Sequence, residues 1–133
     1  MDFKEIEKVI DKYIDEIIEF RRDIHSYPEL SGNEKRTSEK VIEKLKKLPV
    51  EIITNVNGYG IIANLKGNND KKTILLRGDM DALPINETNN LSFISKNKNI
   101  MHACGHDMHT SILLGTSYVL SYFKNKLNGN VKF

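Results

Sequence analysis

Residues 101–110 read MHACGHDMHT. This stretch holds the only cysteine of the chain, Cys104, and three of its four histidines, His102, His106 and His109. Histidine and aspartate gain little from burial unless they are paired or bind a metal, so packing alone does not explain such a cluster. The stretch is therefore predicted to form part of a metal-dependent hydrolytic site.

The composition is that of an ordinary globular protein. The 133 residues suffice for one domain, and 39% of them are hydrophobic, which is a usual share. The net charge of +2 comes from 20 basic and 18 acidic residues that are interspersed, so no nucleic-acid partner is expected. One cysteine excludes an internal disulfide and favours a reducing compartment. The sequence opens without a signal-peptide pattern, and no apolar run approaches the ~20 residues that span a bilayer, so a cytoplasmic protein without a membrane partner is expected.

The first part of the chain predicts two helices. Apolar residues recur with helical period over residues 3–24, and a proline at position 28 is expected to end this helix near residues 26–28. Ser31 and Glu34 have the spacing of a capping box, which predicts a second helix running to about Leu48. The apolar residues expected on its buried face are Val41, Ile42, Leu45 and Leu48.

The middle of the chain predicts strands. Two β-branched runs, residues 50–56 and 60–65, flank the turn-forming pair Asn57 and Gly58, which predicts a hairpin or two adjacent strands. A third strand is expected over residues 72–78.

Beyond this strand, residues 85–100 are polar and irregular, and a long loop is expected there. A helix is predicted over residues 111–123, with its N-terminus close to Asp107, because apolar residues again recur with helical period. A strand should start at Val131.

The strongest metal-binding signal is the pair Cys104 and His106. In an extended segment, residues two apart project to the same side, so both side chains could reach one ion. Thiolate and imidazole suit zinc, and also cobalt, nickel or manganese with less selectivity. Two ligands do not complete a site, so the others must come from elsewhere.

The neighbouring residues have less certain roles. The candidates for orienting the metal ligands from outside are His102, Asp107 and His109. Asp107 could equally be the N-cap of the following helix. His109 is expected to be structural or exposed.

Asp79 and Asp81 form a second motif just after the predicted third strand. They alternate along the chain, so they should point the same way. In open α/β sheets, ligand-binding groups gather beyond the carboxyl ends of strands. Carboxylates there can bind a metal, orient a ligand or support a base, although on spacing alone two exposed loop aspartates explain the pattern as well.

Three blocks, residues 21–30, 77–84 and 101–109, resemble one family in order and spacing across essentially the whole chain. They are similar to metal-dependent amidohydrolases, the group that includes aminoacylases, hippurate hydrolases, N-acetyldiaminopimelate deacetylases and plant auxin-conjugate hydrolases. The resemblance implies a three-layer α/β/α, zinc-peptidase-like catalytic domain, of which residues 1–133 are expected to be the N-terminal portion. It also implies two divalent ions, of zinc, manganese, cobalt or nickel, and hydrolysis of the amide bond of an N-acyl amino acid.

The resemblance also assigns roles to residues. It implies that Cys104 and His106 bind metal and that Asp81 is a catalytic-site aspartate, orienting a metal-binding histidine or supporting the site electrostatically. Asp79 stands where more distant relatives carry a metal-binding histidine, so a supporting role is only one of its options.

Some parts that the resemblance implies have no counterpart in the sequence. The glutamate base of a Pro-Ala-Glu-Glu stretch, the remaining ligands and an inserted dimerisation domain are absent from residues 1–133. The chain alone is therefore expected to be inactive and poorly stable, while the complete enzyme is expected to be a homodimer or larger oligomer.

Two other functions stay open on the sequence. The chain could be a non-catalytic metal-binding or interaction module. Alternatively, Cys104 could be a nucleophile with His106 or His102 as its base.

Overall fold

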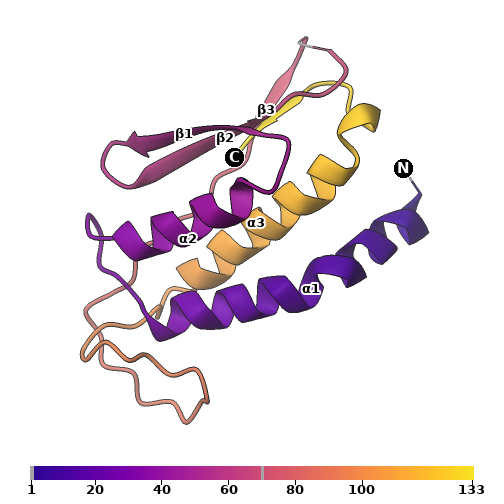
Figure 1. The fold of residues 1–133 in the computed structure, drawn as a ribbon. Helices are drawn as coiled ribbons and strands as arrows, with labels where there is room; N and C mark the ends of the chain where they lie inside the picture. The colour runs from indigo at the N-terminus through magenta and orange to yellow at the C-terminus, as the bar shows by residue number, and fades with distance from the viewer. Residues whose placement is uncertain (1, 70) are drawn as a thin grey trace.

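The computed structural model describes residues 2–69 and 71–133. It is a mixed α/β fold in which a four-stranded sheet lies on one side and the helices lie on the other (Figure 1). In chain order the elements are α1 (Phe3–Ser26), α2 (Lys35–Leu45), β1 (Glu51–Val56), β2 (Gly60–Leu65), β3 (Thr73–Leu75), α3 (His106–Tyr122), a short 3-10 helix η1 (Lys124–Lys126) and β4 (Asn130–Lys132).

Helix α1 confirms the first predicted helix. It ends at Ser26, and Tyr27 leaves the helical conformation with φ −128° just before the proline, as expected because proline disfavours helix in the preceding residue. Phe20 and Ile24 are buried on the face that packs toward the core.

Helix α2 exists, but its predicted capping box is wrong. The helix begins at Lys35, and the Ser31 side chain does not cap it. Instead, the carboxylate of Glu29 accepts hydrogen bonds from the backbone N–H groups of Arg36 (3.0 Å) and Thr37 (2.7 Å). The helix also ends earlier than predicted, at Leu45. Of the four residues expected to be buried, Val41 and Leu45 are buried, whereas Ile42 and Leu48 are half-buried.

The sheet has the strand order β1-β2-β4-β3. The predicted hairpin of antiparallel β1 and β2 is confirmed. The last strand, β4, lies between β2 and β3, antiparallel to the first and parallel to the second. β3 is shorter than predicted, so residues 76–78 already belong to the segment that leads to the two aspartates.

The core lies between the sheet and the helices. Its buried residues come from α1, α2, α3 and the strands β2 and β4, with Ile24 and Leu65 fully enclosed. The predicted loop is confirmed, since no helix or strand occurs between residues 84 and 100. Among the helices of residues 2–69 and 71–133, none is both long enough and apolar enough to cross a membrane.

Candidate metal-binding active site

The segment after β3 and the start of α3 meet at one end of the fold. Gly78 lies against α3 so closely that a Cβ atom there would be 3.1 Å from the backbone oxygen of His109. The Thr110 hydroxyl donates a 2.6 Å hydrogen bond to the backbone oxygen of Asp79. These contacts hold both predicted motifs, from residues 77–84 and 101–110, against each other.

Helix α3 begins at His106, next to Asp107 as predicted and ahead of the apolar stretch 111–123, and its N-cap is Gly105 in the left-handed conformation with φ 78°. Asp107 is therefore not the N-cap, and that alternative is wrong. The left-handed residue also means that residues 104–106 are not extended. The argument that Cys104 and His106 project to the same side assumed an extended segment, so it does not apply here.

Asp81 orients His106. Its Oδ1 lies 2.9 Å from His106 Nδ1, and its backbone oxygen lies 3.0 Å from the same nitrogen. Both oxygens only accept, so Nδ1 carries the hydrogen and Nε2 keeps its lone pair. A carboxylate that fixes a histidine in this tautomer is the usual outer partner of a metal-binding imidazole.

The side chains of Asp79, His106 and His109 converge. One potential ligand atom from each lies within 4.8 Å of the others. The two imidazole rings are 5.6 Å apart between centroids. Asp79 also pairs with the guanidinium of Arg77, whose side chain is 78% exposed. A carboxylate and two imidazoles are a donor set that zinc and similar ions accept, so the residues fit a divalent metal.

Cys104 is a free and exposed thiol outside this group. The Nδ1 atom of His106 makes its hydrogen bond with Asp81 and not with this thiol. The assignment of Cys104 as a metal ligand stays a prediction.

Asp107 is at the centre of a buried polar cluster behind these residues. Its Oδ2 lies 2.7 Å from His25 Nδ1. The same oxygen is 2.7 Å from Arg21 Nε, at ion-pair distance although not aligned as a hydrogen bond. On its other side, His25 Nε2 lies 3.0 Å from Glu87 Oε1. These contacts tie α1, the start of α3 and the 84–100 loop together.

His102 is buried next to this cluster. Neither of its ring nitrogens has a hydrogen-bond partner among the described residues. Burial lowers the pKa of His102, and the nearby His25 and His106 lower it further, against the opposing effect of Asp107. The neutral form of His102 is therefore favoured.

Glu87 was not predicted from the sequence. Its side chain is only 2% exposed and accepts a 2.7 Å hydrogen bond from the backbone N–H of Ser95. Burial by itself raises the pKa of Glu87, but the hydrogen bonds from Ser95, His25 and Asn89 outweigh it and hold the pKa below the usual value. A single acidic residue in a polar loop has no sequence pattern that marks it as buried or functional. Only the contact with His25 in the structure reveals the role of Glu87.

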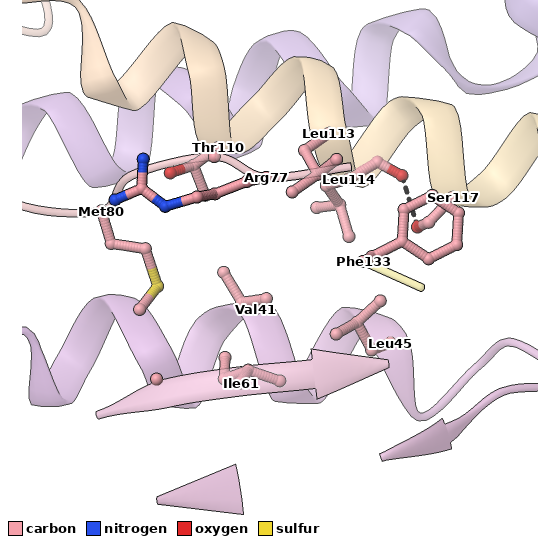
Figure 2. Close-up of a pocket in the computed structure, with 12 residues that line it drawn as sticks. Val41, Leu45, Ile61, Arg77, Met80, Thr110, Leu113, Leu114, Ser117 and Phe133 are labelled. Carbon is pink, nitrogen blue, oxygen red and sulfur yellow. Dashed lines mark hydrogen bonds between the residues drawn. The ribbon is translucent and has the colours of Figure 1, made fainter. Parts of the chain in front are cut away.

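Two hollows adjoin this region. A polar cleft of about 710 Å³ is lined by Tyr59, Arg77, Asp79, Asp81 and His106, among others. An apolar cavity of about 240 Å³ lies between α2, β2 and α3, with Val41, Ile61, Leu114 and Phe133 around it (Figure 2). Asp79 and His106 line the first hollow, so the polar cleft is the better candidate for the active site.

Comparison with known proteins shows which family the chain resembles. The profile described as peptidase family M20/M25/M40 matches residues 75–133. That match shows that this part of the chain is similar to the M20 family, and it confirms the resemblance to metal-dependent amidohydrolases. The matched residues include Asp79, Asp81, Cys104 and His106.

Individual relatives extend the similarity over the whole chain. It is 38% identical over 133 residues to the N-acyl-L-amino acid amidohydrolase of Geobacillus stearothermophilus, covering 100% of this chain and 36% of that protein. It is 45% identical over 132 residues to thermostable carboxypeptidase 2 of Saccharolobus solfataricus, covering 98% and 32%. The chain thus spans about a third of the length of these relatives.

A solved structure agrees with the fold. The Bacillus subtilis YxeP protein, described as a dinuclear metal-binding peptidase of the M20 family, superposes with a TM-score of 0.88 at 41% identity. The superposition covers 92% of this chain and 34% of that one. The predicted α/β fold, of the type found in M20 catalytic domains, is therefore confirmed for the superposed residues.

Proposed function

We propose that this chain supplies part of the active site of a metal-dependent hydrolase that cleaves the amide bond of N-acyl amino acids. The observation that carries the proposal is the geometry at His106. Asp81 holds Nδ1 at 2.9 Å, which leaves Nε2 as the nitrogen for a metal. One potential ligand atom of His106 lies within 4.8 Å of one from Asp79 and one from His109, and Asp79 and His106 line a polar cleft.

The metal belongs to this proposal because the donor set fits it. His106 is the residue that both the resemblance and the geometry favour as a ligand, and Cys104 is the second ligand that the resemblance implies. A bound divalent ion supplies Lewis-acid polarisation of an amide carbonyl and lowers the pKa of water. Asp81 acts through His106, as a positioning residue that fixes the imidazole and its tautomer. The identity of the ion, among zinc, manganese, cobalt and nickel, and the presence of two ions are part of the proposal.

The substrate class rests on the relatives and on charge in the cleft. An N-acyl amino acid and a peptide at its C-terminus share an amide bond next to a free carboxylate, and the printed names of the relatives include both classes of enzyme. Exposed Arg77 lines the same cleft as His106 and offers a cation for such a carboxylate. The partner is thus a small anionic molecule.

The chain by itself should not turn over substrate. No Pro-Ala-Glu-Glu stretch occurs in residues 1–133, so the general base that the resemblance implies is missing. We further propose that residues 1–133 are the N-terminal portion of the catalytic domain, that the complete enzyme is a homodimer or larger oligomer, and that its single-cysteine N-terminal part works in the reducing cytoplasm.

Hydrolysis of N-acetyl amino acids with added zinc or manganese tests this function. Residues 1–133 should be inactive. Where the reading frame continues past the codon for Phe133, the longer product should be active. In that product, His106→Ala should abolish turnover, whereas Met108→Ala, at an exposed position in the same helical turn, should keep it. Metal-independent turnover, or activity that survives His106→Ala, would refute the proposal.

A further inference from the structure

We propose that a buried relay of three side chains, Glu87, His25 and Asp107, positions His106 from behind, so that Glu87 and His25 are positioning residues of the proposed active site. The relay runs from the 84–100 loop through the last turn of α1 to the first turn of α3. This inference rests on the proposed function only for the role of His106.

The relay is continuous and enclosed. His25 Nδ1 lies 2.7 Å from Asp107 Oδ2, and His25 Nε2 lies 3.0 Å from Glu87 Oε1. The three side chains are at most 4% exposed. A carboxylate oxygen accepts hydrogen bonds, so both ring nitrogens of His25 donate and one imidazole bridges two carboxylates. Removing one partner from such a buried group leaves the others uncompensated, so the three side chains depend on one another.

The 84–100 loop packs around His25. The ring of Phe93 stands edge-on to the His25 ring, with 5.5 Å between the centroids. The next residue of α1, Ser26, donates a 3.0 Å hydrogen bond to the backbone oxygen of Phe93. The backbone oxygen of Ser26 accepts a 2.8 Å hydrogen bond from the N–H of Lys96. The loop therefore helps to set the position of His25 at the end of α1.

The first turn of α3 depends on this support. Its N-cap is Gly105, which has no side chain that could accept from the first N–H groups, and a turn without such a cap opens easily. Asp107 is fully buried in this turn, and His25 Nδ1 and Arg21 Nε each lie 2.7 Å from its Oδ2. Successive residues of a helix point about 100° apart. A fixed Asp107 therefore also fixes the direction of His106.

That direction matters because His106 has to meet Asp81. Asp81 Oδ1 lies 2.9 Å from His106 Nδ1, and this contact sets the tautomer that leaves Nε2 for a metal. A first turn that frays lets the imidazole move away from Asp81. A misplacement of about 1 Å in a catalytic group can lower the rate on the order of 100-fold. The relay thus makes the site depend on the 84–100 loop.

Nuclear magnetic resonance of the purified 133-residue chain tests the relay without metal or substrate. Two properties are measured: the tautomer of the His106 imidazole, and the amide hydrogen exchange of the first turn of α3 relative to the rest of that helix. The variants are Glu87→Ala, Glu87→Gln, His25→Phe and Lys96→Ala, and circular dichroism checks that each is folded. Lys96→Ala is the matched control, because Lys96 Nζ donates to Tyr27 Oη at 2.9 Å and fastens the same loop to the end of α1 outside the relay.

The unchanged chain should hold the imidazole in one tautomer, with the hydrogen on Nδ1. Glu87→Ala and His25→Phe should mix the tautomers and speed exchange in the first turn by roughly 10–100-fold, as expected for the loss of a hydrogen bond to a charged group. The rest of α3 should exchange nearly as before. Glu87→Gln keeps an acceptor for His25, so its effect should be smaller. Lys96→Ala should change exchange in the first turn by less than about threefold, as surface substitutions do.

Three results would overturn the relay. The first is exchange that rises equally along all of α3, because the substitutions then lower stability without positioning His106. The second is a single tautomer with slow exchange of the first turn in folded Glu87→Ala, and the third is an equal effect of Lys96→Ala. If His25→Phe does not fold, the two Glu87 variants decide between these outcomes. The hydrolysis assay with His106→Ala tests the proposed function separately, because it does not depend on which residues support His106.

Discussion

Replacing Glu87 by alanine should release the 84–100 loop from the helices. The carboxylate accepts hydrogen bonds from Ser95 N–H at 2.7 Å and from the Asn89 side chain at 3.1 Å, and it lies 3.0 Å from His25 Nε2. Truncation removes these contacts and leaves a buried imidazole nitrogen without its acceptor. At about 0.5–1.5 kcal/mol for an ordinary hydrogen bond, and more for a charged acceptor, the free energy of unfolding should fall by roughly 2–4 kcal/mol.

Glu87→Gln separates charge from shape. Glutamine keeps an oxygen for Ser95 N–H but loses the negative charge that faces His25, so its cost should be about half that of alanine. Thr88→Ala is the matched control, because Thr88 is an exposed neighbour in the same loop, and it should change stability by less than about 0.5 kcal/mol. Urea unfolding followed by circular dichroism gives the three values, and limited proteolysis reports opening of the loop.

The pH dependence gives the same reasoning a second test. The pKa of Glu87 is lowered in the fold, from about 4.3 in an unfolded chain. Its stabilising effect is therefore complete above that value and is lost as the pH falls through the folded pKa. The difference between the unchanged chain and Glu87→Gln should be largest near neutral pH and shrink in acid. A difference that stays constant down to pH 3, or an alanine effect below about 0.5 kcal/mol, would refute the anchoring role.

Three further substitutions test other parts of the structure. Glu29→Ala should destabilise the chain by about 1–2 kcal/mol, because it removes the acceptor for the first N–H groups of α2; an unchanged urea midpoint would contradict this. Gly105→Ala should lower the free energy of unfolding by about 1–2 kcal/mol because of the positive φ alone, since an added Cβ meets nothing within 4 Å. A much larger loss of stability would mean that the added methyl group clashes with its surroundings. Asp81→Asn should lower zinc affinity by roughly 10–100-fold while the fold persists, because it weakens the support of His106; unchanged affinity in a titration would remove Asp81 from that role.

Periodicity and turn chemistry predicted most of the elements. Helix α1 follows from the 3.6-residue repeat of its apolar residues, and the hairpin follows from the Asn57-Gly58 turn. The start of α2 was not predicted correctly. Ser31 and Glu34 have the spacing of a local capping box, but the backbone N–H groups at the start of the helix donate to the side chain of Glu29 instead. The contact from Glu29 depends on the path of the chain before the helix, and the spacing of residues in the sequence does not predict that path.

The candidate site was predicted in its residue types but not in its grouping. Asp81 lies against His106, whereas the resemblance implied only that Asp81 orients a metal-binding histidine or supports the site electrostatically. His109 is exposed, as expected, and it also lies near His106, because the helix begins at His106 and places the two histidines one turn apart. Spacing rules need the backbone conformation between residues, and the left-handed Gly105 was not evident beforehand. Glu87 and His25 are 62 positions apart, so no local pattern links them.

The position of β4 has a consequence for how the chain folds. β4 contains residues 130–132, yet it joins β2 to β3 in the middle of the sheet (Figure 1). On the ribosome, the β1–β2 hairpin can form as soon as it emerges, but β3 has no partner strand until the synthesis of some 55 further residues, from Leu75 to Asn130, is complete. Closing that long loop is entropically costly and slow. During this interval β3 exposes unpaired backbone next to the apolar side chains of Ile74 and Leu75, which stay exposed even in the completed sheet. The nascent chain is therefore most open to aggregation or chaperone binding then.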